Sequence, residues 1–227
     1  VGYRHIDTAE IYGNQREIAQ AIKESGIARA DLFITSKVWR DNLAYKDVCL
    51  ACEKILDDLK TEYLDLYLIH WPNREIPVSE TLSALRDLKN KGFIRAIGVS
   101  NFTVFHLEDA LKTGIEIVNN QVELHPTFAQ NELVEFCKEK QISVTAYSPL
   151  GKGRDLEHPV VLELAKKYER PVSQVILNWL IARDIIAIPR SSKPGHIEDN
   201  FKSLEWKLSL EDCALLEGLS AGNRMIN

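Results

Sequence analysis

Four side chains of contrasting chemistry occupy corresponding places in the first third of the chain. Asp7, Lys37 and His70 each stand at or next to the end of a short apolar run, and Tyr12 follows Asp7 after a turn of small residues. If the three runs are parallel strands of a barrel, their carboxyl ends meet at one mouth, where the active sites of such barrels lie. The spacing therefore predicts one site that holds a carboxylate, an amine, an imidazole and a phenol.

These four groups together suit the protonation of a carbonyl oxygen. An unperturbed tyrosine is a weak acid with a pKa of about 10, but a nearby ammonium such as that of Lys37 favours the phenolate and eases proton donation. Asp7 would hold the ammonium in place, and His70 could hydrogen-bond the oxygen that receives the proton. Because no side chain supplies a hydride, reduction of the carbonyl carbon implies a nicotinamide cofactor.

Each residue also has a plainer interpretation. Asp7 could cap the turn after it, Lys37 could be a solvated charge at a strand end, and Tyr12 could be an aromatic residue at the rim. A different chemistry is also open to Lys37, which could form a Schiff base with a carbonyl substrate as in barrel aldolases. That reaction would need no nicotinamide.

The apolar pattern alternates between strand-like runs and helical periodicity along the whole chain. Strands are predicted to end at residue 7 and to span residues 32–38, 64–70, 94–100, 115–123, 142–148 and 185–189. Helices are predicted at residues 15–25, 46–60, 79–91, 104–112, 131–140, 160–168, 173–183, 197–203 and 209–219. We expect Asn14 to cap the first helix, Gly26 to end it, Pro171 to open the helix at 173–183, and Ser209 to cap the last helix.

Strict alternation of strands and helices indicates a parallel sheet. A doubly wound open sheet would carry a GxGxxG loop after an early strand, and the sequence has none. The 227 residues instead suit one α/β barrel, which typically has about 250. We therefore expect an α/β fold, a (β/α)8 TIM barrel, as a single domain over residues 1–227. Seven strands are one short of eight and the chain starts at a strand edge without Met, so we expect the first strand-helix unit to lie upstream.

Composition and charge limit the classes of partner. Hydrophobic residues make up 45% of the chain and charged residues 27%, which supports a well-buried core. The net charge is −5, and the basic residues form no stripe, which argues against nucleic acid or an anionic membrane as the main partner. No apolar run reaches the roughly 20 residues of a membrane span. We expect a cytoplasmic protein, a monomer or weak dimer, that acts on a small carbonyl substrate.

The four cysteines give no sign of a metal or redox centre. Cys49 and Cys52 form a CxxC pattern, but they lie inside a predicted helix with no second ligand pair nearby. Reduced cysteines in a helix are the ordinary interpretation. The sequence therefore predicts no metal site.

Several segments resemble the signatures of the aldo-keto reductase family. They match in order from residue 1 to about residue 200 and comprise residues 2–14, 34–39, 68–72, 97–102, 120–126 and 146–151. The resemblance implies a (β/α)8 barrel that binds NADP(H) in extended form without a Rossmann motif. It also implies that Tyr12 is the proton donor, that Lys37 and Asp7 tune its acidity, and that His70 orients the carbonyl.

The same resemblance implies a cofactor site and a substrate pocket. Ser100, Asn101 and Gln121 match positions that hydrogen-bond the nicotinamide amide, and Tyr147 matches the ring on which nicotinamide stacks. Trp39 and Trp71 match the aromatic walls of the substrate pocket, although as plain residues they could equally be rim packing. The remaining cofactor residues implied are Ser148, Leu150, Arg190, Ser191, His196 and Asn200.

Two departures from the family pattern affect the adenosine end of that site. The family usually has Lys where this chain has Arg190, and often Arg where it has His196. Arg190 retains a planar fork suited to phosphate, whereas His196 is a weaker cation near neutral pH. We therefore expect NADPH as the cofactor and hold dual use with NADH as a hypothesis.

Short loops indicate a shallow substrate pocket. Only residues 152–158 separate the 146–151 segment from the next helix, and the loop after Pro72 is also brief. Small bacterial family members, the 2,5-diketo-gluconate and methylglyoxal reductases, are similar in this respect. Small aldehydes and dicarbonyls are thus the expected substrates. The alternative is a non-catalytic regulatory or structural protein that binds the cofactor on the same fold.

Overall fold

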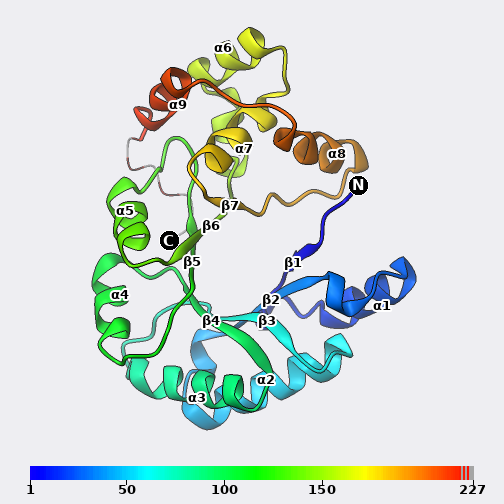
Figure 1. Cartoon of the computed structure of the whole chain (residues 1–227), viewed down its shortest axis with the longest axis vertical. Coiled ribbons are helices and arrows are strands. Elements are labelled where there is room, and N and C mark those ends of the chain that lie inside the picture. The colour runs from blue at the N-terminus through cyan, green and yellow to red at the C-terminus, as the bar shows by residue number, and fades with distance from the viewer. Residues whose placement is uncertain (221, 223, 225–227) are drawn as a thin grey trace. The chain divides into compact units, whose positions relative to one another are not determined.

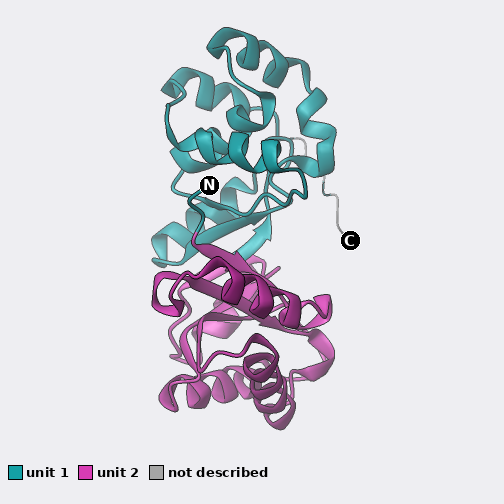
Figure 2. Ribbon diagram, turned by 90° about the vertical axis from the view of Figure 1, so that its right-hand side faces the viewer, with its two compact units in different colours: residues 1–3, 121–227 teal, residues 4–120 magenta. Residues whose placement is uncertain are grey.

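The chain forms two compact units, shown in different colours in Figure 2. A computed structural model describes residues 1–220, 222 and 224. The N-terminal unit is Arg4–Asn120, and the C-terminal unit is Gln121–Asn227 together with Val1–Tyr3. The assignment of residues 1–227 to a single domain stays a prediction.

Four parallel strands form the centre of the N-terminal unit. They are β1 (His5–Asp7), β2 (Phe33–Val38), β3 (Leu64–Ile69) and β4 (Ile94–Ser100), and they pair in chain order. Asp7 lies opposite Thr35, Lys37 opposite Leu68, and Ile69 opposite Val99. This register places the carboxyl ends of the four strands along one edge of the sheet.

Helices connect these strands and lie on their outer side (Figure 1). Every residue of β3 is buried, as expected for a parallel strand covered on both faces. The α-helices are α1 (Gln15–Ser25), α2 (Tyr45–Leu59), α3 (Val78–Asn90) and α4 (Val104–Leu111). Single 3-10 turns are η1 (Glu10–Tyr12), η2 (Arg29–Asp31) and η3 (Arg40–Asn42).

The C-terminal unit continues the alternation. β6 (Ser143–Tyr147) pairs in parallel with β7 (Ile186–Ala187), and β5 (Asn119–Glu123) crosses the boundary between the units. Its helices are α5 (Asn131–Glu139), η4 (Gly151–Glu157), α6 (Pro159–Tyr168), α7 (Val172–Ala182), α8 (Pro194–Phe201), η5 (Lys202–Leu204) and α9 (Leu210–Glu217). α7 is the most buried of these helices, and Trp179 on it is fully buried.

The predicted elements are all present, most of them with boundaries shifted by one or two residues, and in three of them the shift has a local reason. The strand predicted at 115–123 begins at Asn119, because the Thr113 hydroxyl accepts from Ile115 N and holds a turn there. The strand predicted at 185–189 is only Ile186–Ala187, since Pro189 has no N–H for a sheet hydrogen bond. The helix predicted at 197–203 starts earlier, at Pro194, a residue that suits the first helical turn.

The predicted caps have different outcomes. Ser209 caps α9, with its hydroxyl accepting from Asp212 N at 3.1 Å. Asn14 precedes α1 as predicted, but its side chain accepts from the Thr8 hydroxyl at 2.7 Å and makes no cap hydrogen bond. Asn14 therefore ties the turn after β1 to the start of α1.

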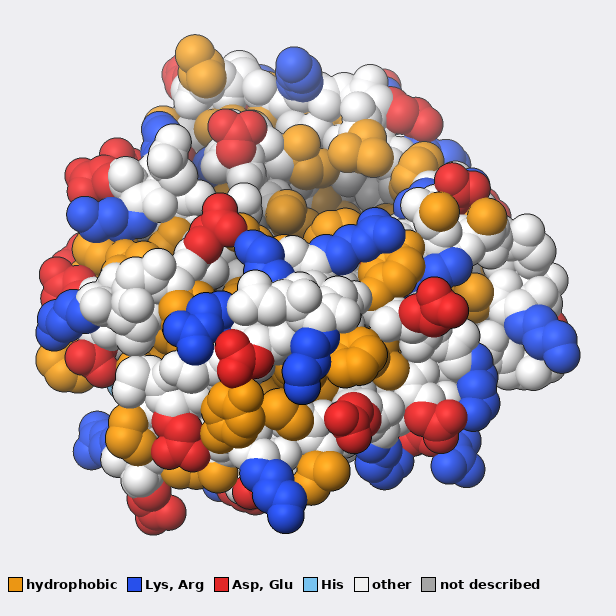
Figure 3. Space-filling view, turned by 60° about the horizontal axis from the view of Figure 1, so that its bottom comes forward, with side chains coloured by type: hydrophobic (Ala, Val, Ile, Leu, Met, Phe, Trp, Pro, Cys, Tyr) orange, Lys and Arg blue, Asp and Glu red, His pale blue; other side chains and the backbone are white. Residues whose placement is uncertain are grey.

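The surface carries both signs of charge. On the face shown in Figure 3, Lys and Arg side chains are interspersed with Asp and Glu side chains and with small hydrophobic patches. Within the described part of the chain, no helix is long and apolar enough to cross a membrane.

A substitution at Gly98 in β4 would test how closely the sheet is packed. A Cβ at this position would lie 2.5 Å from Leu68 Cδ2 and 2.8 Å from the Asn119 carbonyl oxygen. We expect Gly98→Ala to lower the free energy of unfolding by about 1–3 kcal/mol through overpacking, measured by urea denaturation. Gly195→Ala is the matched control, because a Cβ there meets nothing within 4 Å. Equal stability of the two variants would contradict this description of the core.

Candidate active site

Lys37 and Asp7 form a buried ion pair at the carboxyl edge of the N-terminal sheet. Asp7 ends β1, and Lys37 precedes the last residue of the neighbouring β2. Lys37 Nζ donates to Asp7 Oδ1 at 2.5 Å and to the Thr8 carbonyl oxygen at 2.9 Å. Parallel pairing of β1 with β2 thus joins two residues that are 30 positions apart in the sequence.

Burial alters the behaviour of this lysine. The Lys37 side chain is 0% exposed, and the Asp7 side chain is 11% exposed. Burial lowers the pKa of Lys37, and the Asp7 carboxylate opposes that shift. An amine that is fully enclosed and donates to two acceptors is poorly placed to attack a substrate. The geometry therefore favours an electrostatic role for Lys37 over the Schiff-base alternative.

His70 directly follows β3 and lies among aromatic rings. Its ring centroid is 5.9 Å from that of Tyr12 and 5.2 Å from that of Trp39, both edge to face. Burial, together with the positive charge of Lys37, lowers the pKa of His70 to about 4. The imidazole is therefore neutral at physiological pH. Within the described residues its Nδ1 makes no hydrogen bond.

Tyr12 is carried by the 3-10 turn η1 and is 52% exposed, so its ring can meet a ligand. The Lys37 Nζ lies 5.4 Å from the centroid of the Tyr12 ring. Gly13 closes the turn with a φ of 63°, a left-handed conformation that glycine adopts readily, and Tyr12 N donates to the Ala9 carbonyl oxygen at 3.0 Å. The structure thus brings Asp7, Tyr12, Lys37 and His70 together as the sequence predicts.

Glu10 is a positioning residue that the sequence did not reveal. Its Oε2 accepts from Trp39 N at 2.7 Å, and its Oε1 accepts from Asn42 Nδ2 at 2.5 Å. These bonds fasten the turn of Tyr12 to the segment that follows β2. No spacing signal could have identified Glu10, because its partners come from another strand end about 30 residues along the chain.

Two of the predicted cofactor residues lie beside the tetrad. Ser100 ends β4, and Asn101 follows it with a φ of 62°. The Asn101 side-chain amide donates to the His70 carbonyl oxygen at 3.0 Å and to Ser100 Oγ at 3.1 Å. Trp71 is half-buried next to His70. This edge of the sheet therefore carries a hydroxyl and an amide group next to the backbone of His70.

The other predicted cofactor residues belong to the C-terminal unit. Gln121 is buried on β5, and Tyr147 is half-buried at the end of β6, before Ser148 and Leu150. Arg190 and His196 are exposed, Ser191 is half-buried, and Asn200 is buried on α8.

This donor set fits a dinucleotide. The exposed Arg190 and the half-buried Ser191 precede the N-terminus of the eight-residue α8. A guanidinium, a hydroxyl and a helix N-terminus are groups that bind phosphate. Tyr147 supplies a ring for stacking, and Gln121 supplies an amide that can pair with a carboxamide.

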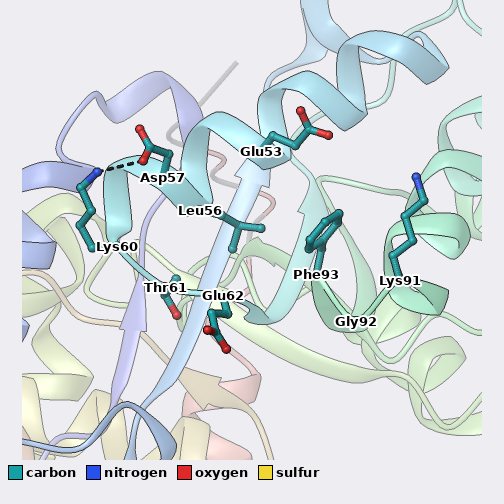
Figure 4. A pocket seen from close by; sticks show the side chains of 9 residues that line it. All are labelled: Glu53, Leu56, Asp57, Lys60, Thr61, Glu62, Lys91, Gly92 and Phe93. Carbon is teal, nitrogen blue, oxygen red and sulfur yellow. Dashed lines mark hydrogen bonds and ion pairs between the residues drawn. The ribbon is translucent and has the colours of Figure 1, made fainter.

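Two hollows of the N-terminal unit do not contain the tetrad. One of about 700 Å³, shown in Figure 4, lies where β3 and β4 begin, at the opposite edge of the sheet from Lys37. Its lining mixes charges, and Lys60 is paired with Asp57. The other, of about 640 Å³, is lined by residues of the 72–78 segment, by apolar groups such as Phe102 and by charged groups such as Asp109.

The buried His70 makes stability depend on pH. Below pH 6.5 the unfolded imidazole binds a proton, whereas folded His70 resists protonation down to about pH 4. Stability is therefore lost as the pH falls through this window. Between pH 7 and pH 5 we expect wild type to lose on the order of 2 kcal/mol more than His70→Gln, measured by urea denaturation. If wild type and His70→Gln lost the same free energy of unfolding over this pH range, His70 would not be the cause of the pH dependence.

Comparison with known proteins gives consistent matches over the whole chain. The aldo/keto reductase family model matches residues 1–221. Glyoxal reductase of Bacillus subtilis (strain 168) is 45% identical over 225 residues, 99% of this chain and 81% of that protein. A putative 2,5-diketo-D-gluconic acid reductase B has a TM-score of 0.97 at 34% identity, covering 100% of this chain and 82% of that one. An aldo-keto reductase of Bombyx mori, solved in complex with NADP, has a TM-score of 0.93 at 34% identity, covering 100% and 81%.

These matches confirm the predicted α/β fold of the (β/α)8 type. They also establish the general chemistry, an oxidoreductase that depends on NAD(P)H, with NADPH as the cofactor of the family. Sequence, structure and family match agree that this chain belongs to the aldo/keto reductase family.

Proposed function

We propose that this protein reduces small aldehydes, ketones and dicarbonyls to alcohols with NADPH, and that Tyr12 donates the proton. The observation that carries the proposal is that the buried Lys37–Asp7 pair and the neutral imidazole of His70 both lie near the Tyr12 ring. NADPH, when bound, supplies the hydride for the carbonyl carbon.

Each residue of the tetrad has a distinct task in this proposal. As the Tyr12 hydroxyl gives its proton to the carbonyl oxygen, negative charge develops on the phenol oxygen, and the Lys37 ammonium stabilises that charge. Asp7 keeps the ammonium protonated and in place. Neutral His70 carries one ring N–H, with which it hydrogen-bonds and orients the carbonyl oxygen before transfer.

The residues that would hold the cofactor follow the family resemblance. Ser100, Asn101 and Gln121 would bind the nicotinamide amide, and Tyr147 would stack against the ring. Residues of the C-terminal unit would hold the rest of the cofactor; they are Ser148, Leu150, Arg190, Ser191, His196 and Asn200.

Small substrates agree with the walls and loops around the tetrad. Trp39 and Trp71 would provide aromatic surface, and the segment between β3 and α3 is short. The similarity to a protein named glyoxal reductase supports the same size of substrate. A non-catalytic protein on this fold would have no need for a fully assembled tetrad, so its presence favours the enzyme.

The role of Tyr12 is tested by substitution. We expect this chain to oxidise NADPH in the presence of methylglyoxal, and Tyr12→Phe to lose at least about a hundredfold in kcat because the proton donor is gone. NADPH affinity, measured by fluorescence titration, should stay unchanged. The proposal fails if Tyr12→Phe keeps wild-type turnover, and NADPH binding without turnover in wild type would favour a non-catalytic protein.

Cofactor preference tests Arg190. We expect NADPH to bind more tightly than NADH, by less than several hundredfold, because Arg190 would supply a guanidinium to the 2′-phosphate and His196 stands where the family often has Arg. Arg190→Ala should raise the Kd for NADPH about tenfold and leave the Kd for NADH unchanged. Lys207→Ala, which removes an exposed cation elsewhere in the unit, is the control. If Arg190→Ala raised the Kd values for NADPH and NADH equally, Arg190 would not be a ligand of the 2′-phosphate.

A further inference from the structure

The segment that follows β6 has an unusual backbone. Ser148, Gly151, Lys152 and Gly153 have φ values of 47°, 54°, 50° and 98°. Left-handed conformations cost free energy for residues other than glycine, and they persist only where the surroundings impose them. The hydrogen bonds from Gly151 N to Ser148 O and from Gly153 N to Leu150 O lie within the segment. They shape it but do not anchor it.

A buried carboxylate connects this segment to the end of β5. Asp155, on η4, is 1% exposed. Its Oδ2 accepts from Thr127 N at 3.1 Å and lies 3.0 Å from His125 Nδ1, and its Oδ1 accepts from Thr127 Oγ1 at 2.8 Å. His125 Nε2 lies 3.2 Å from Glu123 Oε1. A fully buried acid network therefore links η4 to the residues just beyond β5.

The strained segment packs directly on the Asp155 carboxylate. A Cβ at Gly151 would lie only 2.6 Å from Asp155 Oδ1, so this close approach requires glycine. β5 and β6 are adjacent, because Leu124 N donates to the Tyr147 carbonyl oxygen at 3.4 Å. The start of the segment is thus fixed by β6, and its far end is fixed by Asp155.

The carboxylate is held in its charged form. Burial alone would raise the pKa of Asp155, but hydrogen bonds from His125 and Thr127 outweigh the burial and lower the pKa. A buried anion with several donors resists displacement, because losing one partner leaves a charged group unsatisfied.

We propose that Asp155 is a positioning residue for cofactor retention, which latches residues 148–153 against His125 and Thr127 so that Ser148 and Leu150 are held for NADPH. This inference rests on the proposed function, in which Ser148 and Leu150 contact the cofactor. Release of the latch frees the strained segment to relax, and the cofactor then leaves faster.

The test compares variants of Asp155 by NADPH binding alone. Asp155→Ala removes the latch, and Asp155→Asn keeps the volume and an acceptor but not the charge. We expect the Kd and the dissociation rate of NADPH, from stopped-flow fluorescence, to rise about tenfold or more in Asp155→Ala and less in Asp155→Asn. Glu157→Gln, a charge removed from an exposed residue of the same turn, is the matched control and should bind as wild type does.

A second readout separates positioning from general damage. At saturating NADPH, the KM for methylglyoxal should stay within about twofold of wild type in the Asp155 variants, since the substrate site lies with the tetrad. Gly151→Ala places a methyl group against the Asp155 carboxylate. It should weaken NADPH binding as Asp155→Asn does. The proposal can therefore be tested even if Asp155→Ala does not fold.

The failures can be told apart. Wild-type NADPH affinity and dissociation rate in a folded Asp155→Asn and Gly151→Ala would overturn the latch and leave the proposed function intact. Wild-type protein that binds no NADPH would overturn both. The turnover of Tyr12→Phe has no bearing on this test, because NADPH binding is measured in the absence of the carbonyl substrate.

Discussion

The enclosed ion pair between Lys37 and Asp7 is the interaction on which the candidate site depends. Removing an ammonium from water costs several kcal/mol unless close partners replace the lost hydration. Here the Asp7 carboxylate and the Thr8 carbonyl oxygen replace it. The pair exists only because β1 and β2 lie side by side in parallel with Asp7 and Lys37 near their carboxyl ends. Sheet topology therefore creates the electrostatic environment.

That positive charge also adds to the effect of burial on its neighbour, His70. His70 is buried and feels the field of Lys37, and both effects oppose a second cation. The site consequently combines one buried cation, one anion, a neutral imidazole and an accessible phenol. Groups whose environments push them into different protonation states can divide acid and hydrogen-bonding tasks between them. Glu10 holds the turn of Tyr12 in position, because its carboxylate accepts a hydrogen bond from the backbone N–H of Trp39.

Buried polar groups have a different use in the C-terminal unit. The Glu123, His125 and Asp155 network is closed to solvent. Its partners come from the end of β5 and from η4, so it joins a strand end to a strained segment. Networks of this kind are rigid when every member has a partner. Both units therefore use buried charge to hold the segment just beyond a strand in place.

The sequence by itself determined the order of strands and helices, because apolar periodicity reports burial locally, and it determined the tetrad, because Asp7, Lys37 and His70 recur at the ends of such runs. Short motifs also carried the family resemblance. Partners that are distant in sequence were decided only by the tertiary structure: Glu10 with Trp39 and Asp155 with His125. Protonation states belong to the same class, since the low pKa of His70 comes from burial and from a charge on another strand. Local sequence specifies which face of an element is buried, but it does not specify what that face meets.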